Sequence, residues 1–207
     1  MKTLNINLHR HLRFAAAILA MGFLTIAGSA HAGDNVPIKG TLTGSFVGGD
    51  PDAGLFVAEL SGKVSHLGKT TVTVVVDSDD LQFVDCEGNS TNDPSCFALS
   101  EEGFLMALAT IPQTVIFKAA NGDELWVTQQ ATGFVIILAP PGRVGAFPET
   151  LIDATITGGT GRFENATGSY TASGRQIHVE GGANDLLETS FEGTISTVGS
   201  RGGNGNE

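Results

Sequence analysis

Residues 36–46 read VPIKGTLTGSF, and this stretch decides the fold because its apolar side chains recur at every second position. Val36, Ile38, Leu42 and Phe46 alternate with mostly polar residues, and two glycines occupy the remaining even positions. Successive side chains of a β-strand point to opposite faces of the sheet, so a period of two indicates a strand with one buried face. Such a strand needs partners that bury the same face.

The same period continues along the chain. Apolar and polar residues alternate over residues 56–64, and residues 70–77 are rich in β-branched side chains, which favour strands. Asn121 and Gly122 lie between two alternating segments and are typical of a hairpin turn. Further candidate strands cover residues 104–111, 115–119, 125–131, 134–138, 151–157, 169–173, 177–180 and 189–196.

Short strands at hairpin spacing are typical of a barrel or a sandwich. No long amphipathic helix interrupts them. We predict an all-β protein in which a single closed antiparallel β-barrel spans residues 33–198 and follows an N-terminal signal peptide. Residues 199–207 contain no apolar side chain to bury, so this tail is expected to be disordered.

The first 32 residues have the pattern of a cleavable secretory signal peptide. A basic start is followed by the apolar run FAAAILAMGFLTIAG at residues 14–28 and by AHA, a small-x-small cleavage site, at residues 30–32. The alternative is a membrane anchor, but a helix needs about 20 apolar residues to cross a bilayer. We therefore expect an exported protein, periplasmic or extracellular, that is cleaved after Ala32.

The charge of the mature chain excludes several kinds of partner. All 22 acidic residues follow residue 32, against 8 of the 11 basic ones, which leaves a net charge of −14. Such a surface repels phosphate backbones and anionic headgroups, so we expect no nucleic-acid partner. The chain has one Trp and one Tyr, too few for the aromatic girdles of an outer-membrane barrel, so the mature barrel is not expected to span a membrane.

The two cysteines, Cys86 and Cys96, lie in the polar segment DCEGNSTNDPSC. In an oxidising compartment we expect them to form a disulfide, with a metal pair and a reactive thiol as the alternatives. Neither a further Cys nor a nearby His completes a zinc site. Residues 77–80 begin like a calcium loop, but the following positions lack its ligands and its glycine. We expect no metal and no cofactor.

One histidine is a candidate catalytic residue. If the period of two continues beyond residue 64, His66 falls on the same face as Leu60 and Val64, which should point inward. A histidine inside a barrel can orient or protonate a ligand. The alternative is a core or rim histidine bonded to a backbone carbonyl. His178, in a later candidate strand, ranks below His66.

The segment ITGGTGRFENATG, residues 156–168, resembles the glycine-rich signature GG[ST]G-x-F-x-x-A-x-G of the allene oxide cyclase and dirigent barrels. The matching residues are Gly158, Gly159, Thr160, Gly161, Phe163, Ala166 and Gly168. FEGTI at residues 191–195 is similar to the closing strand of that family. SHLGKT and AANGDEL, at residues 65–70 and 119–125, also look like segments of bacterial exported proteins with this barrel.

The resemblance implies a barrel of about eight strands with a ligand-sized interior, and it implies that a homo-oligomer can form. The family includes cyclases and proteins that steer radical coupling, as well as members without known activity. The shared signature is a structural motif that carries no catalytic residue. No catalytic Glu, Asp or Cys of the plant enzymes aligns with this chain, so the resemblance predicts a fold and no reaction.

Three functions remain open. The first is an exported barrel that binds a small apolar, lipophilic molecule in its interior, because small eight-stranded barrels either fill with side chains or hold one small ligand. The second is a structural or surface-interaction barrel without a ligand. The third is a cyclase-like enzyme that uses His66 for proton transfer. We favour binding over catalysis.

Overall fold

The computed structural model describes residues 35–50, 53–138, 145–146, 148–178 and 185–196, all within the compact unit Ala32–Glu207. The predicted signal peptide, residues 1–32, and the predicted disordered tail, residues 199–207, lie outside the described residues. Within the described ranges, no helix combines the length and the apolar character that crossing a bilayer requires.

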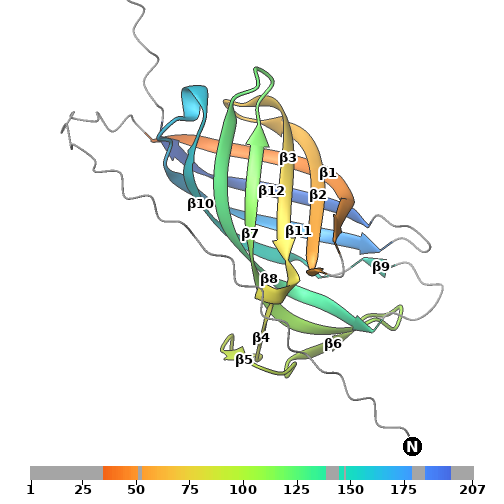
Figure 1. Cartoon of the computed structure of the whole chain (residues 1–207). Helices are drawn as coiled ribbons and strands as arrows, with labels where there is room; N and C mark the ends of the chain where they lie inside the picture. The colour runs from red at the N-terminus through yellow and green to blue at the C-terminus, as the bar shows by residue number, and fades with distance from the viewer. Residues whose placement is uncertain (1–34, 51–52, 139–144, 147, 179–184, 197–207) are drawn as a thin grey trace, which may run out of the picture. The chain divides into compact units, whose positions relative to one another are not determined.

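Eight long strands of the described residues form a closed antiparallel barrel (Figure 1). They are β1 (Asn35–Asp50), β2 (Leu55–Val64), β3 (Gly68–Asp77), β7 (Leu105–Lys118), β8 (Glu124–Leu138), β10 (Thr150–Gly159), β11 (Gly168–His178) and β12 (Leu186–Ser196). Neighbours follow the order β3, β2, β1, β12, β11, β10, β8 and β7, and the pairing of β3 with β7 closes the ring. The predicted fold class is confirmed.

The alternation that starts at residue 36 places the expected side chains inside the barrel. Ile38, Leu42, Leu60 and Val64 are exposed by only 1, 3, 6 and 3%. The charged and hydroxyl side chains between them face solvent. One apolar core cluster therefore runs through the barrel, as a period of two in every strand requires.

Strands β7 and β8 are longer than the sequence predicts, because each joins two segments that were expected to be separate strands. β7 continues through Pro112. The pairing of β7 with β3 stops at Gln113, and its pairing with β4 starts at Thr110, so Pro112 lies in the gap between the two partners. No described strand pairs with Pro112 on that side, so its missing N–H leaves no ladder bond unmade. The proline therefore does not end the strand.

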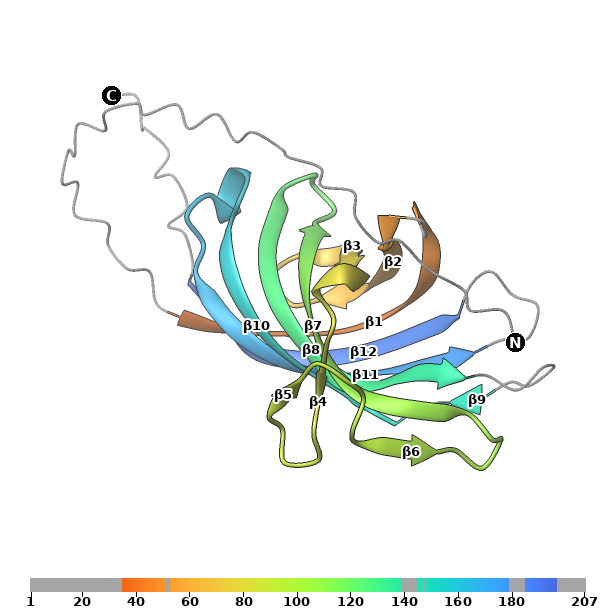
Figure 2. The same cartoon turned by 60° about the horizontal axis from the view of Figure 1, so that its bottom comes forward.

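Beyond the barrel, β7 and β8 carry a small extension (Figure 2). β4 and β6 pair with β7, β5 pairs with β4, and β9 pairs with the end of β11. The short elements are η2 (Ser78–Asp80), β4 (Gln82–Val84), β5 (Ser90–Thr91), β6 (Phe97–Leu99), β9 (Gly145–Ala146) and η3 (Gly161–Phe163). Strands of two or three residues are too short to show a period, which is why the sequence did not predict them.

The two ends of the barrel differ. We call the end with the β7–β8 hairpin and η3, at the top of Figure 1, the closed end. Phe163 of η3 and Ala166 are exposed by 6 and 0% there and belong to the core cluster. We call the opposite end, where β3 ends at Asp77 and β11 ends at His178, the open end.

A layer of three aromatic rings fills the middle of the barrel. Phe117, Tyr170 and Phe191 come from β7, β11 and β12 and are exposed by 2, 5 and 6%. Their ring centroids lie 6.1 Å apart for Phe117 and Tyr170, 5.7 Å for Phe117 and Phe191, and 4.9 Å for Tyr170 and Phe191. Such spacings are typical of packed aromatic side chains. Only about 40 Å³ of open space remains beside these rings, so the layer separates the closed end from the open end.

Glycines of the motif at residues 158–168 lie where a Cβ atom would collide with neighbouring groups. Gly168 has a φ of +148°, and its Cβ would lie 2.1 Å from the carbonyl oxygen of Thr194 on β12. Gly161 has a φ of +56°, and its Cβ would lie 2.1 Å from Oδ1 of Asp123. These positions require glycine, and they allow η3 and β11 to approach their neighbours closely.

Candidate functional site

The open end contains an apolar pocket of about 610 Å³. It lies among the ends of β1, β3 and β11, the start of β2, and the parts of β7 and β8 that leave the barrel. Its apolar lining includes Phe46, Phe56, Val76, Ile111, Phe134 and Ile136. Phe46 and Phe56 meet edge to face, with ring centroids 6.4 Å apart. Pockets of roughly 300–1,000 Å³ with apolar walls are typical of small-molecule sites.

The open space shrinks towards the middle of the barrel. A cavity of about 150 Å³, lined in part by Leu60, Val74 and Gln113, shares several lining residues with the pocket. Beside the aromatic layer only about 40 Å³ remains. The resemblance implied that the interior of the barrel could hold a ligand. Phe117, Tyr170 and Phe191 fill the middle of the barrel, so the ligand-sized space inside it lies at the open end instead.

A chain of polar side chains runs from the aromatic layer to the pocket. The hydroxyl of Tyr170 donates to Oε1 of Gln129 over 3.0 Å, and Nε2 of Gln129 donates to Oε1 of Gln113 over 2.5 Å. Burial raises the pKa of Tyr170 above its ordinary value of 10.0, so the hydroxyl remains protonated and acts as a donor. Gln113 lines the pocket and gives its floor an amide group.

A second polar cluster lies at the rim of the same pocket. Nδ1 of His178 lies 2.8 Å from Oδ1 of Asp185, and Nε2 of Gln176 donates to Oδ2 of Asp185. All three residues line the pocket. The ring of Phe104, which is fully buried, packs edge to face on the imidazole of His178 at 5.7 Å. The pocket thus combines apolar walls with polar groups at its floor and its rim.

The expected inward orientation of His66 is wrong. β2 ends at Val64, and His66 lies in the following turn with a φ of +64°, so the period of two does not reach it. Its side chain is exposed, and its Nε2 lies 3.0 Å from the carbonyl oxygen of Pro37. This contact corresponds to the alternative of a rim histidine bonded to a backbone carbonyl.

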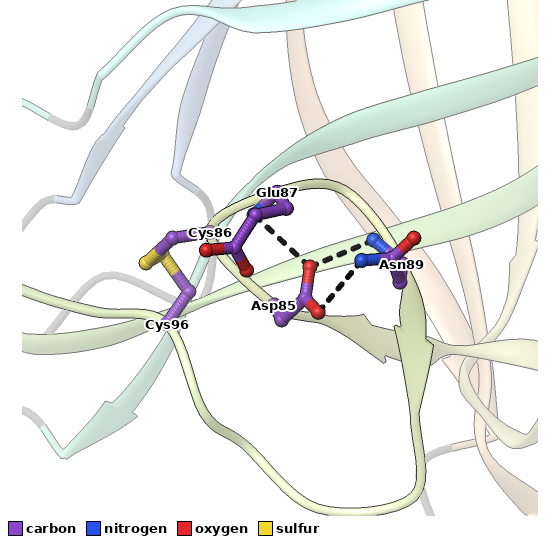
Figure 3. Close-up of a disulfide and its surroundings, with 5 residues drawn as sticks. All are labelled: Asp85, Cys86, Glu87, Asn89 and Cys96. Atoms are coloured by element: carbon purple, nitrogen blue, oxygen red, sulfur yellow. Dashed lines mark hydrogen bonds between the residues drawn. A yellow bond between two sulfur atoms is a disulfide. The ribbon is translucent and has the colours of Figure 1, made fainter.

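The expected disulfide between Cys86 and Cys96 is confirmed (Figure 3). Next to it the carboxylate of Asp85 accepts hydrogen bonds from the backbone N–H groups of Glu87 and Asn89 and from Nδ2 of Asn89. These bonds, the one from the Asn89 side chain first, lower the pKa of Asp85 below its ordinary value of 3.8. No group of three or more His, Cys, Asp or Glu residues in the described ranges could hold a metal ion.

A larger open depression of about 1110 Å³ lies on the outer face of β1, β8, β10, β11 and β12. Its lining consists mostly of exposed polar side chains such as Thr128, Asp153, Thr155 and Thr171. It lacks the apolar walls and the enclosure that small-molecule sites use. We therefore place the candidate site in the smaller pocket at the open end.

The sequence contained a signal for part of this site. Gln129 follows Leu125 and Val127 at a spacing of two, so it lies on the same inward face of the strand. It was therefore a polar residue on a face that the sequence pattern predicts to be apolar. Asp185 gave no such signal, because its position opposite His178 depends on the register of β11 with β12, in which Ile177 pairs with Leu186.

No protein-family model matches the chain, and no curated protein matches it. Among solved structures, the chain is similar to the pterocarpan synthase dirigent protein GePTS1, at 15% identity over 88% of this chain and 99% of that chain, with a TM-score of 0.33. The barrel assignment itself rests on the strand pairing of this chain. The resemblance of residues 156–168 to the allene oxide cyclase and dirigent barrels implied a barrel of about eight strands, and the pairing of this chain forms a closed ring of eight strands.

Proposed function

We propose that the protein is an exported barrel that binds a small apolar molecule at its open end. One observation carries this proposal: the pocket of about 610 Å³ has apolar and aromatic walls, whereas only about 40 Å³ of open space remains beside the aromatic layer in the middle of the barrel. Its size falls in the range of roughly 300–1,000 Å³ in which proteins hold small ligands. The disulfide agrees with an oxidising compartment, either the periplasm or the exterior.

The driving force is the removal of apolar surface from water. Phe56 is 36% exposed and Phe46 is half-buried, so the pocket leaves aromatic surface in contact with solvent. Burial of apolar surface contributes roughly 25 cal/mol per Å², and an apolar ligand would cover surface of this kind on both partners. An anionic ligand would gain no ion pair there, because the described residues that line the pocket include no Lys or Arg and the chain is acidic.

Titration with the neutral fluorescent probe N-phenyl-1-naphthylamine tests the proposal, together with native mass spectrometry of protein purified from its own host. We expect saturable binding and a retained small molecule. Ala131→Leu should remove binding, because Ala131 lines both the pocket and the cavity beneath it, and the larger side chain would occupy that space. Ala120→Leu is the matched control, since Ala120 is exposed in the β7–β8 turn.

Circular dichroism and thermal melting establish that both variants are folded. Equal binding by Ala131→Leu and Ala120→Leu would place the probe elsewhere. No binding of the probe, together with an empty protein from the native host, would refute the proposal and favour a structural or surface-interaction barrel.

A further inference from the structure

His178 is held in a defined orientation at the rim of the pocket. Its Nδ1 lies 2.8 Å from Oδ1 of Asp185, whose other oxygen is occupied by Nε2 of Gln176. The ring of Phe104 packs edge to face against the imidazole. The contact with the carboxylate and the packing of the aromatic ring together restrain the orientation of the imidazole.

The pairing with Asp185 also determines which nitrogen of the imidazole carries the proton. A carboxylate can only accept, so Nδ1 of His178 carries a hydrogen and donates it. In the neutral imidazole, Nε2 is then an acceptor with a free lone pair. Among the described residues Nε2 has no hydrogen-bond partner, and none of their buried side-chain nitrogen or oxygen atoms lacks one. Nε2 is therefore accessible rather than enclosed.

We propose that His178 makes the pocket selective for apolar molecules that carry a hydroxyl group, such as hydrophobic alcohols and phenols. The O–H of the ligand donates to Nε2 of His178, and Asp185 acts as a positioning residue that keeps this nitrogen an acceptor. This inference rests on the proposed function, because it names the ligand class of the same pocket.

The selectivity follows from the cost of an unmade hydrogen bond. A ligand without a donor covers Nε2 and removes it from water without replacing the lost bond, whereas a hydroxyl replaces it. Sites built to bond a ligand hydroxyl discriminate strongly against analogues that lack it, because the protein group is then left unpaired. The apolar walls bind the carbon skeleton of both kinds of ligand equally.

The test compares two probes that share a carbon skeleton, 2-naphthol and 2-methoxynaphthalene, in the same buffer. We expect the wild-type protein to bind 2-naphthol about tenfold more tightly, the effect of one hydrogen bond. His178→Phe keeps a ring at the rim and should remove the preference while 2-methoxynaphthalene still binds. His66→Phe, the same change at an exposed histidine outside the pocket, should leave the preference intact.

The positioning role of Asp185 has its own readout. An asparagine amide can present either its oxygen or its nitrogen to Nδ1, so Asp185→Asn no longer fixes the proton of the imidazole. We expect this variant to show a reduced preference and a change in the ¹⁵N chemical shifts of His178 towards a mixture of tautomers. Unchanged shifts would refute the positioning role.

The outcomes separate the two proposals. If neither probe binds, the proposed function fails. If both bind with equal affinity, or if His178→Phe keeps the preference, the pocket binds apolar molecules without selecting a hydroxyl, and this inference fails alone.

Discussion

The closed and open ends of the barrel are built by the same eight strands with the same alternation of side chains. At the closed end, Phe163 and Ala166 are buried in the core, and glycines allow η3 to lie against neighbouring strands. At the open end, Phe46 and Phe56 remain partly exposed around a pocket of about 610 Å³. The alternation determines which face is apolar, and the side chains and turns at each end determine whether the interior is filled.

The contrast separates the part of the molecule that is tightly packed from the part where we propose that a ligand binds. Tight packing contributes most to stability, whereas a binding site needs surface that is incompletely buried in the free protein. The aromatic layer of Phe117, Tyr170 and Phe191 is the boundary between the two. Substitutions on opposite sides of this layer should therefore have different consequences.

The largest expected effect is at the boundary itself. Phe117→Ala removes a ring that is 2% exposed and contacts two other aromatic residues, so it should lower the free energy of unfolding by about 3–5 kcal/mol. Phe56→Ala, at the open end, removes a ring that is 36% exposed and should cost about 1 kcal/mol. Urea denaturation measures both, and equal losses would mean that the open end is packed as tightly as the aromatic layer.

Glycine substitutions sharpen the comparison. Gly168→Ala, at the closed end, combines a positive φ with a Cβ that would lie 2.1 Å from a backbone oxygen, so we expect a loss of about 2–4 kcal/mol. Gly48→Ala, near the open end, meets nothing within 4 Å and has no positive φ. Its unfolding free energy should change by less than about 1 kcal/mol. A stable Gly168→Ala variant would contradict the packing described for η3 and β11.

Loss of the disulfide should affect the extension rather than the closed end. Cys86 and Cys96 are separated by 10 positions, so the double Ser variant should lose about 2–3 kcal/mol at most. Hydrogen exchange should accelerate in β4 and β6 and remain slow in β11 and β12. Faster exchange throughout the barrel would show that the extension stabilises the ring.

The smallest expected effect concerns the turn beside the disulfide. Folding lowers the pKa of Asp85, so the ionised carboxylate is the form that the fold stabilises. This contribution is present above the ordinary pKa of 3.8 and is lost as the pH falls below it. Asn89→Ala removes the first cause of the shift, and an NMR titration should show the pKa of Asp85 rising towards its ordinary value. An unchanged pKa would assign the shift to the backbone bonds alone.

Much of the fold follows from local patterns. The period of two predicted that Ile38, Leu42, Leu60 and Val64 lie inside, and the two cysteines predicted a disulfide; the structure confirms both. The continuity of β7 through Pro112 was not predicted, because tolerance of a proline depends on which neighbour is paired at that point.

The site was much harder to predict than the fold. The sequence placed His66 inside by extending a strand through a turn, and the left-handed backbone of His66 places it outside instead. The pairing of His178 with Asp185 depends on the register of two strands. The position of the pocket depends on how large side chains from distant strands fill the middle of the barrel. Neither property is contained in a local pattern.

The central claim is that an apolar molecule binds at the open end of a barrel whose closed end is filled. Intermolecular nuclear Overhauser effects between N-phenyl-1-naphthylamine and assigned methyl groups test it directly. The account predicts contacts with Val76, Ile111 and Ile136 at the open end and none with Ile38 or Ile156 in the filled interior towards the closed end. Contacts with the second set, or with neither set, would contradict it.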